Sequence, residues 1–309
     1  MVKHKCLMKK IKRINDNLSN NNIEVNDGLD DDKCVLAKPK PKGMITGSSL
    51  HIDDFLGKNF PHRTMIMSPW LKQGTITLVY AKRGLGKTWF GLLTAVAVTR
   101  GLPIFPWQTI TPVGCLYLDG EMACEELQSR LRQLTIGLPP ERAPLNIISS
   151  EHLKSNNETA IDLVDEKCRN NILYDLKQDN SLRLLIIDNL SCLAPRISEN
   201  SKQHWDSINQ WLLELRAIGV AVIMIHHTGK KDGSPRGTSA REDNIDVSIS
   251  LEEANDDEEE DISFRGVKFV AIFTKSRGLC GNDAAPLTIK IAEGYAGKLP
   301  WETCSKDRE

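Results

Sequence analysis

The stretch GTITLVYAKRGLGKTWFGLLT, residues 74–94, decides the fold that we predict for this chain. Its apolar beginning, Thr75–Tyr80, predicts a buried strand, and a glycine-containing loop follows at residues 81–86. A helix is then expected to begin at Lys87. In this order of elements, the backbone N–H groups of the loop and of the helix N-terminus face a bound phosphate and favour its negative charge. The stretch therefore predicts a triphosphate-binding site at the end of a strand.

The loop follows the spacing GxxxxGK(S/T), except that Ala81 stands at the position of the first glycine. We expect Lys87 to reach the β- and γ-phosphate oxygens of ATP, and the Thr88 hydroxyl to coordinate Mg²⁺. Alanine suits position 81 only if its φ stays negative. A chance match is the alternative, but the surrounding strand and helix favour a phosphate loop. The predicted nucleotide-binding residues are Ala81, Lys82, Arg83, Gly84, Leu85, Gly86, Lys87, Thr88 and, from a later strand, Asp188.

The composition is that of a soluble globular protein, with 309 residues, 40% of them apolar and 26% charged. This length suits one large α/β domain with a tail, or two small domains. No apolar run approaches the ~18 residues of a membrane span, and the N-terminus lacks the apolar core of a signal peptide. The eight cysteines show neither CxxC nor a Cys/His ligand spacing, which favours reduced thiols over disulfides or a zinc site. We therefore expect a cytoplasmic protein without membrane contact.

Charge is distributed unevenly along the chain. The net charge of −1 combines +6 from residues 1–13, −8 from residues 252–261 and +1 from the rest. Residues 1–43 are basic, then rich in Asn and Asp, and end in AKPKPKG, so we predict a flexible tail and linker. A basic arm on nucleic acid is the alternative to this solubilising tail. The acidic run is expected to form a solvated hairpin tip.

Residues 44–309 are predicted to form a single α/β domain, because strand and helix signals alternate at βαβ intervals. The strands are expected at residues 115–120, 145–149, 182–189 and 220–227, and the helices at 121–137, 159–178 and 201–219. From residue 244 onward, strands follow one another at 244–251, 266–276 and 285–294. This pattern predicts a mostly parallel central sheet between helices, with antiparallel strands added at one edge.

Two acidic residues follow different predicted strands. Asp188 ends the most apolar strand, so it should lie at the ligand edge of the sheet and support Mg²⁺ beside Thr88. Glu121 comes two residues after another strand, where it could activate the water that attacks the terminal phosphate. Asp119 competes for this role, since alternation along the strand does not decide which acid faces the site. We prefer Glu121.

The segment after residue 225 carries two histidines and a cationic loop. His226 and His227 are neighbours on a strand and therefore point to opposite faces, which argues against a two-histidine metal site. One of them could contact the γ-phosphate, and the sequence leaves open which. Loop 228–241 is rich in glycine, serine and cations, which suits the backbone of single-stranded DNA. An exposed loop without a partner is the alternative. The cations are Lys230, Lys231, Arg236 and Arg241.

At these residues the chain resembles the RecA-like ATPases, in the branch of the hexameric replicative helicases such as DnaB and the plasmid-encoded RepA helicase. Glu121-Met122, followed by Leu127 and Arg130, is similar to the DnaB pattern after its second core strand. HHTGK…RGTSA (226–240) resembles the RepA-type sensor and DNA loop, and FTKSRG (273–278) resembles the KxRxG element. The resemblance covers residue 44 to the C-terminus, and we also expect an AAA-type ATPase classification.

The resemblance implies that Lys275 and Arg277 reach across a subunit interface to the γ-phosphate of a neighbouring subunit, in a homo-oligomeric ring that is expected to be a hexamer. An arginine in that place stabilises transition-state charge and makes hydrolysis depend on assembly. Without the resemblance, the two residues are cations on one face of a strand end, where ordinary surface charge is the alternative. Ala81 departs from the family pattern, and we expect neither a DnaB-type N-terminal helical domain nor a primase or zinc module.

The predicted function is that of an oligomeric Mg²⁺-dependent ATPase acting on DNA, as a phage- or plasmid-type replicative helicase or a close relative. One alternative is a RecA-type recombination or repair ATPase, or a loader, that does not unwind DNA. Another is a nucleotide-dependent regulatory protein that binds partners through its tail and its acidic run. A small-molecule kinase is the weakest alternative, because it explains neither Glu121 nor the Lys275–Arg277 element.

Overall fold

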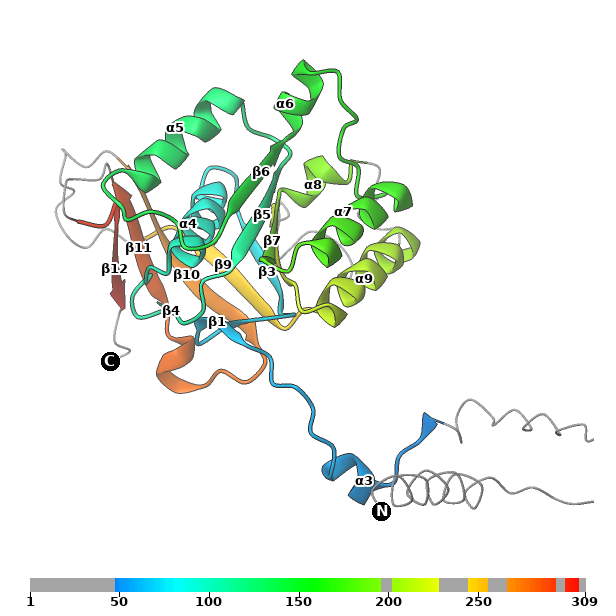
Figure 1. Ribbon diagram of the computed structural model, residues 1–309. Coiled ribbons are helices and arrows are strands. Elements are labelled where there is room, and N and C mark those ends of the chain that lie inside the picture. The colour runs from blue at the N-terminus through cyan, green and yellow to red at the C-terminus, as the bar shows by residue number, and fades with distance from the viewer. Residues whose placement is uncertain (1–47, 196–201, 228–243, 255–265, 293–297, 306–309) are drawn as a thin grey trace, which may run out of the picture. The chain divides into compact units, whose positions relative to one another are not determined.

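The computed structural model describes residues 48–195, 202–227, 244–254, 266–292 and 298–305 (Figure 1). The chain divides into two compact units, residues 1–61 and 62–309. In the first unit lies the short helix α3 (Ile52–Leu56), which begins where the His51 side chain accepts a hydrogen bond from the Asp53 N–H. The predicted tail at residues 1–43 lies outside the described residues, so the predicted boundary at residue 44 stays a prediction. Most of the acidic run, residues 255–261, also lies outside them.

The second unit is built on a nine-stranded sheet in the order β12-β11-β10-β9-β3-β8-β7-β5-β6. Six adjacent strands are parallel, from β9 to β6. They are β3 (Ile76–Ala81), β5 (Gly114–Asp119), β6 (Leu145–Ser149), β7 (Leu182–Asp188), β8 (Ala221–His227) and β9 (Val247–Glu252). Three further strands continue the sheet in antiparallel fashion beyond β9. They are β10 (Gly266–Ser276), β11 (Leu287–Ala292) and β12 (Trp301–Ser305). The predicted α/β fold with antiparallel edge strands is confirmed.

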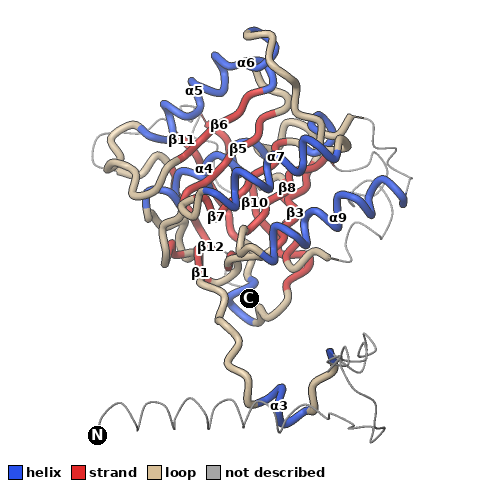
Figure 2. The backbone as a smooth tube through the Cα atoms, turned by 45° about the vertical axis from the view of Figure 1, so that its right-hand side comes forward, coloured by secondary structure: helices blue, strands red, loops and turns tan. Residues whose placement is uncertain are grey.

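Helices cover both faces of the parallel strands (Figures 1 and 2). One apolar core joins the sheet to α4 (Lys87–Arg100) and α5 (Cys124–Thr135), and a second core joins it to α7 (Glu166–Gln178) and α9 (Lys202–Ala217). The short helices α6 (Ser150–Ser155), α8 (Leu190–Leu193) and η2 (Gly281–Ala284) complete the unit. Strands enclosed on both faces must be apolar throughout, which explains why β3 is buried along its whole length.

Several element boundaries differ from the predicted ones. Helix α5 begins at Cys124 instead of residue 121, which leaves Glu121 in the preceding loop. Helix α7 begins at Glu166 instead of residue 159, because the Asp165 side chain caps it by accepting from the Lys167 N–H. The prediction that the strand near residues 244–251 is antiparallel is wrong: β9 pairs in parallel with β3. The direction of a strand depends on how the preceding connection crosses the sheet, and hydrophobic periodicity does not report it.

A small second sheet was not predicted. It has the order β2-β1-β4 and consists of β1 (Met65–Ser68), β2 (Leu71–Lys72) and β4 (Gln108–Thr109). Strands of two residues carry no recognisable alternation, so the sequence offers little signal for them. Trp70 and Trp107 pack edge to face beside this sheet, with ring centroids 5.6 Å apart. These aromatic contacts join the small sheet to the apolar core around α4.

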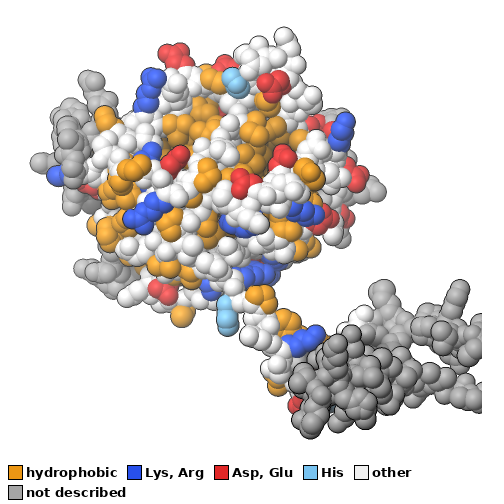
Figure 3. All heavy atoms as spheres, in the orientation of Figure 1, with side chains coloured by type: hydrophobic (Ala, Val, Ile, Leu, Met, Phe, Trp, Pro, Cys, Tyr) orange, Lys and Arg blue, Asp and Glu red, His pale blue; other side chains and the backbone are white. Residues whose placement is uncertain are grey.

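The edge strand β6 leaves part of the large sheet uncovered. Asn146 and Ile147 of this strand are exposed. In Figure 3, apolar side chains gather between the positions of α5, α6 and α7, over this edge. Among the helices in the described ranges, none is both long and apolar enough to cross a membrane.

Candidate active site

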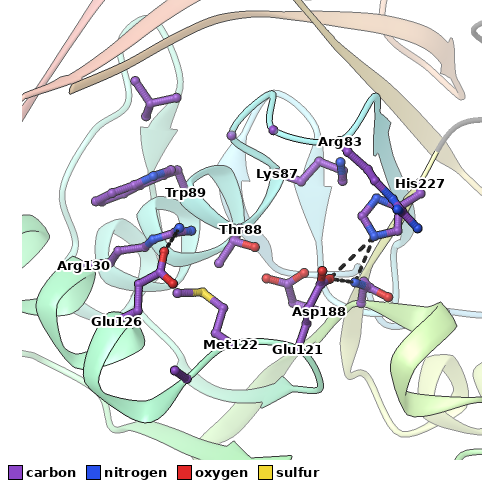
Figure 4. Close-up of a pocket in the computed structure, with 15 residues that line it drawn as sticks. Arg83, Lys87, Thr88, Trp89, Glu121, Met122, Glu126, Arg130, Asp188 and His227 are labelled. Atoms are coloured by element: carbon purple, nitrogen blue, oxygen red, sulfur yellow. Dashed lines mark hydrogen bonds and ion pairs between the residues drawn. The ribbon is translucent and has the colours of Figure 1, made fainter. Parts of the chain in front are cut away.

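The carboxyl ends of four parallel strands bring the predicted acidic residues and one histidine together with the phosphate loop. Ala81 at the end of β3 is in register with His227 at the end of β8, and Asp119 of β5 is in register with Asp188 of β7. A cavity of about 400 Å³ opens at this edge (Figure 4). It is lined by Arg83, Gly84, Gly86, Lys87, Thr88, Trp89, Glu121, Met122, Ala123, Glu126, Arg130, Asp188, Asn189, His227 and Val267. Open α/β sheets bind ligands at this edge.

The backbone of the phosphate loop explains which positions require glycine. Gly84 and Gly86 have φ values of +83° and +87°, in the left-handed region. A Cβ added to Gly86 would also approach a ring carbon of Phe269 to 2.8 Å. Ala81 is the last residue of β3, and its φ is not among the positive values, as its side chain requires. Helix α4 begins at Lys87 as predicted, so its first N–H groups face the cavity edge.

Lys87 lies buried at the centre of the loop. Its Nζ donates hydrogen bonds to the carbonyl oxygens of Ala81, at 3.1 Å, and of Lys82, at 2.6 Å. Burial lowers the pKa of Lys87, whereas the charges of Asp188 and Glu121 raise it. Ala81, Lys82 and Leu85 do not line the cavity themselves. Ala81 and Lys82 act here through their backbone carbonyls, and Leu85 packs against the apolar core.

Asp188 is buried next to Thr88. The Tyr117 hydroxyl donates a hydrogen bond of 2.7 Å to Asp188 Oδ2, and the Thr88 hydroxyl donates another to the same carboxylate. Burial raises the pKa of Asp188, and these two hydrogen bonds lower it. Thr88 and Asp188 thus offer the oxygen ligands that suit Mg²⁺. No group of three or more His, Cys, Asp or Glu side chains in the described ranges could hold a metal ion alone.

The two competing acids lie in different environments. Glu121 lines the cavity, and 57% of its side chain is exposed. Asp119 is buried, does not line the cavity, and accepts the Met122 N–H with both carboxylate oxygens, at 3.4 and 3.3 Å. Burial is the largest cause that raises the pKa of Asp119 to about 6. Glu121 is therefore the acid that can meet a water molecule in the cavity.

The two histidines point to opposite faces of β8, as expected from strand geometry. His227 lines the cavity, and its Nε2 lies 3.5 Å from Glu121 Oε2. His226 is buried on the other face, with Nδ1 3.3 Å from the Ser191 hydroxyl. Burial lowers the pKa of His227, the nearby Lys87 charge lowers it further, and Glu121 raises it. Of the two histidines, only His227 is placed to meet a ligand of this cavity.

The far end of the cavity holds an aromatic and ionic cluster (Figure 4). The guanidinium carbon of Arg130 lies 5.0 Å from the centroid of the Trp89 ring, in a cation–π contact. Arg130 also pairs with Glu126, one turn earlier on α5. We did not predict Trp89 or Glu126 as site residues, although Trp89 directly follows Thr88 and the i,i+4 spacing of Glu126 and Arg130 is visible in the sequence. Val267 reaches the cavity from β10, and no local pattern marks it.

Lys275 and Arg277 do not join this cavity. Ser276 of β10 is paired with Val247 of β9, and Val247 is paired with Thr77, near the start of β3. The phosphate loop follows the other end of β3, so Ser276 and the loop lie at opposite ends of this strand. Val267, at the other end of β10, lines the cavity. With ~3.3 Å of rise per strand residue, Arg277 lies roughly 30 Å from Val267 along the strand. Arg277 Nη1 lies 3.5 Å from Asp246 Oδ1 of the same chain. The predicted DNA loop, residues 228–241, lies outside the described residues.

Comparison with known families agrees with this geometry. The family described as an AAA domain matches residues 46–233, which is 188 of the 309 residues and more than half of the chain. The match includes the phosphate loop, Glu121, Asp188 and His227, and it ends before β9–β12. A comparison with curated proteins finds no match.

Proposed function

This chain belongs to the AAA domain family of P-loop ATPases, and we propose that it binds ATP with Mg²⁺ and hydrolyses it in the cavity at the carboxyl edge of the sheet. One observation carries the proposal. Glu121, in the loop after β5, and Asp188, at the end of the neighbouring strand β7, meet Lys87 and Thr88 of the phosphate loop in a single cavity. A cation, a pair of oxygen ligands for a metal and a water-accessible carboxylate are the groups that phosphoryl transfer to water requires.

Each residue has a distinct role in this proposal. The backbone N–H groups from Gly84 to Thr88 and the Lys87 ammonium bind the phosphates. Thr88 and Asp188 hold Mg²⁺, which neutralises charge on the phosphate oxygens when it is bound. Glu121 orients the attacking water and accepts its proton, because its carboxylate is exposed to the cavity. His227 contacts the terminal phosphate from the end of β8.

The Trp89–Arg130 cluster supports a nucleotide as the ligand, rather than a small phosphate ester. The cluster lies in the same cavity as Lys87, on the side away from His227 (Figure 4). The guanidinium of Arg130 has one face toward Trp89, so its other face can stack on a base. We propose that the phosphates occupy the Lys87 end and the base the Arg130 end.

We further propose that the chain acts as a homo-oligomeric ring, with six subunits as the expected number. Lys275 and Arg277 lie at the opposite end of β10 from Val267, so they cannot reach the phosphate loop of their own subunit. Two subunits arranged head to tail would bring these cations to the neighbour's cavity, where they would stabilise the charge of the transition state.

The activity that we propose for this oligomer is movement on single-stranded DNA, as a replicative helicase or a close relative. Support comes from the cations of loop 228–241, which follows His227 directly. A γ-phosphate contact at His227 could thereby change the position of the loop. Neutralising Lys230, Lys231 and Arg236 together should weaken DNA binding and flatten its dependence on salt.

The decisive experiment measures ATP turnover by the purified full chain with and without single-stranded DNA, together with its mass by light scattering. We expect turnover that requires Mg²⁺, rises severalfold with DNA and accompanies an oligomer. Turnover that ignores DNA would contradict the DNA-dependent activity and favour a nucleotide-dependent regulatory protein. A DNA-stimulated enzyme that fails to separate a forked duplex would instead be a recombination or loading ATPase.

A further inference from the structure

Asn189 lies at the point where Glu121 and His227 meet. It follows Asp188 directly, precedes α8 and has 1% of its surface exposed. Its Nδ2 donates a hydrogen bond to Glu121 Oε2 and lies 3.2 Å from His227 Nε2. Three strand ends, those of β5, β7 and β8, thus converge on one amide group.

The close approach of these strand ends depends on Gly120. A Cβ at this position would come within 2.8 Å of Leu193 Cγ and 2.9 Å of Cys192 Cβ, both in α8. The Gly120 N–H also donates to the Asp188 carbonyl oxygen at 2.7 Å. The loop that carries Glu121 is therefore held directly against the residue pair Asp188–Asn189.

The orientation of the Asn189 amide follows from its second contact. Its Oδ1 accepts the backbone N–H of Cys192 at 3.1 Å, as the N-cap of α8. Because a backbone N–H can only donate, the oxygen must face Cys192 and the NH₂ group must face the cavity. An N-cap asparagine is favourable in itself, but the cap uses only one end of the side chain. The other end is left to hold Glu121.

The Asn189 amide also contacts His227. Asn189 Nδ2 lies 3.2 Å from His227 Nε2, which also lies 3.5 Å from Glu121 Oε2. His227 Nδ1 is buried and has no hydrogen-bond partner among the described residues. Asn189 thereby places one carboxylate and one imidazole in defined orientations at the same time.

We propose that Asn189 is the positioning residue of the active site: its amide fixes one carboxylate oxygen of Glu121, so that the other oxygen faces the attacking water. Without this anchor, Glu121 is a largely exposed side chain on a loop and samples many rotamers. Orientation of the reacting groups is a large part of enzymatic rate enhancement. This inference rests on the proposed ATP hydrolysis, with Glu121 as the catalytic residue.

The variant Asn189→Asp separates positioning from capping. Aspartate keeps the oxygen that caps α8, but it replaces the amide donor with a second acceptor beside Glu121. Because the new carboxylate is buried, we expect a lower melting temperature, but a chain that still folds and that binds ATP with a dissociation constant within threefold of that of the unaltered chain. We expect kcat at saturating Mg²⁺ to fall at least tenfold. A matched control is Asp165→Asn, which makes the reverse exchange at the N-cap of α7 and should leave kcat unchanged.

The same exchange in a chain that already carries Glu121→Gln tests whether Asn189 acts through Glu121. In a Glu121→Gln chain, the additional Asn189→Asp exchange should change the single-turnover rate less than twofold, because the carboxylate that it positions is already gone. An equal loss of rate in both backgrounds, or full activity of Asn189→Asp alone, would overturn the inference.

A spectroscopic readout keeps the inference separate from the proposed function. The side-chain amide resonances of Asn189, identified by their loss in Asn189→Asp, should shift on Glu121→Gln exchange in the nucleotide-free protein. Resonances that do not move would overturn the Asn189–Glu121 contact. A chain without ATP turnover whose resonances do move would contradict the proposed function and leave the contact standing.

Discussion

The Tyr117 hydroxyl donates a 2.7 Å hydrogen bond to Asp188 Oδ2, and both side chains are buried at the floor of the cavity. This contact joins the middle of β5 to the end of β7. Burial raises the pKa of Asp188, and the Tyr117 hydrogen bond is the largest effect that lowers it again. Tyr117 therefore helps to keep Asp188 ionised beside Lys87 and Thr88, which is the state that the proposed Mg²⁺ site requires.

Replacing Tyr117 by phenylalanine should destabilise the protein, because the buried Asp188 carboxylate loses a donor. A hydrogen bond to a charged group contributes about 2 kcal/mol. We expect the free energy of unfolding in urea at pH 7.5 to fall by this amount, and the Mg²⁺ concentration for half-maximal turnover to rise. Tyr80→Phe is the matched control, since it removes a 3.0 Å hydrogen bond to the neutral Thr274 hydroxyl and should cost about 1 kcal/mol. Equal losses in the two variants would contradict a charged Asp188.

Asp119→Asn should stabilise the protein in a pH-dependent way. Burial raises the pKa of Asp119 from 3.8 to about 6. Between these values the native state keeps the proton that the unfolded chain has released, so stability falls as pH rises. Asparagine avoids this cost, and it keeps an oxygen for the Met122 N–H. The stability gain should grow from near zero at pH 4 to roughly 2–3 kcal/mol at pH 7. Urea unfolding at both pH values measures it, and a gain independent of pH would refute the buried acid.

Glu121→Gln should bind ATP like the unaltered chain and lose hydrolysis by at least a hundredfold, because glutamine cannot accept the proton of water. Nucleotide affinity by fluorescence and turnover by phosphate release measure the two effects separately. Asp119→Asn serves as the control and should keep turnover within a fewfold. The reverse result would assign the role to Asp119.

Lys87→Ala should lose nucleotide binding itself, and undiminished turnover in that variant would remove the site assignment.

Arg277→Ala should be inactive alone and recover activity in mixed oligomers with Lys87→Ala. In such mixtures, some interfaces combine the intact phosphate loop of one subunit with the intact Arg277 of the next. Turnover measured across mixing ratios should pass through a maximum. A flat, inactive series would show that Arg277 acts within its own subunit, where it lies 3.5 Å from Asp246.

Trp89→Leu should weaken ATP binding about tenfold, because Arg130 loses the ring that orients it for stacking on the base. Leucine retains apolar bulk beside Thr88, so the phosphate loop itself should stay intact. Inorganic tripolyphosphate, which has no base, provides the control ligand, and its affinity should not change. Equal weakening of both ligands would place the effect of Trp89 at the phosphates.

The phosphate loop was predictable because its signal is local. A strand, a glycine loop and a helix beginning at Lys87 occupy consecutive residues, and the structure places them as expected. The same holds for Asp188, which ends a strand whose apolar run marks burial on both faces. Helix α5 was predicted too long because its apolar residues continue the helical spacing on both sides, and the first turn carries no recognisable cap.

Other parts of the site depend on contacts between residues far apart in the chain. The choice of His227 over His226 required knowing which face of the sheet carries α4. Asn189 was not predicted, since its function follows from an amide shared with residues 68 and 38 positions away. The sequence did not predict the parallel pairing of β9 with β3 either, because the direction of a strand depends on the connection that leads into it.

By itself, the sequence determined that a glycine-containing loop of the P-loop type follows the end of a buried strand, because loop geometry and hydrophobic runs are encoded by neighbouring residues. Only the tertiary structure decided which side chains surround that phosphate loop. Register between parallel strands set Asp119 beside Asp188 and Ala81 beside His227, and the antiparallel pairing of β10 with β9 placed Arg277 at the opposite edge. Such pairings depend on how strands pack in the sheet, which local propensity does not specify.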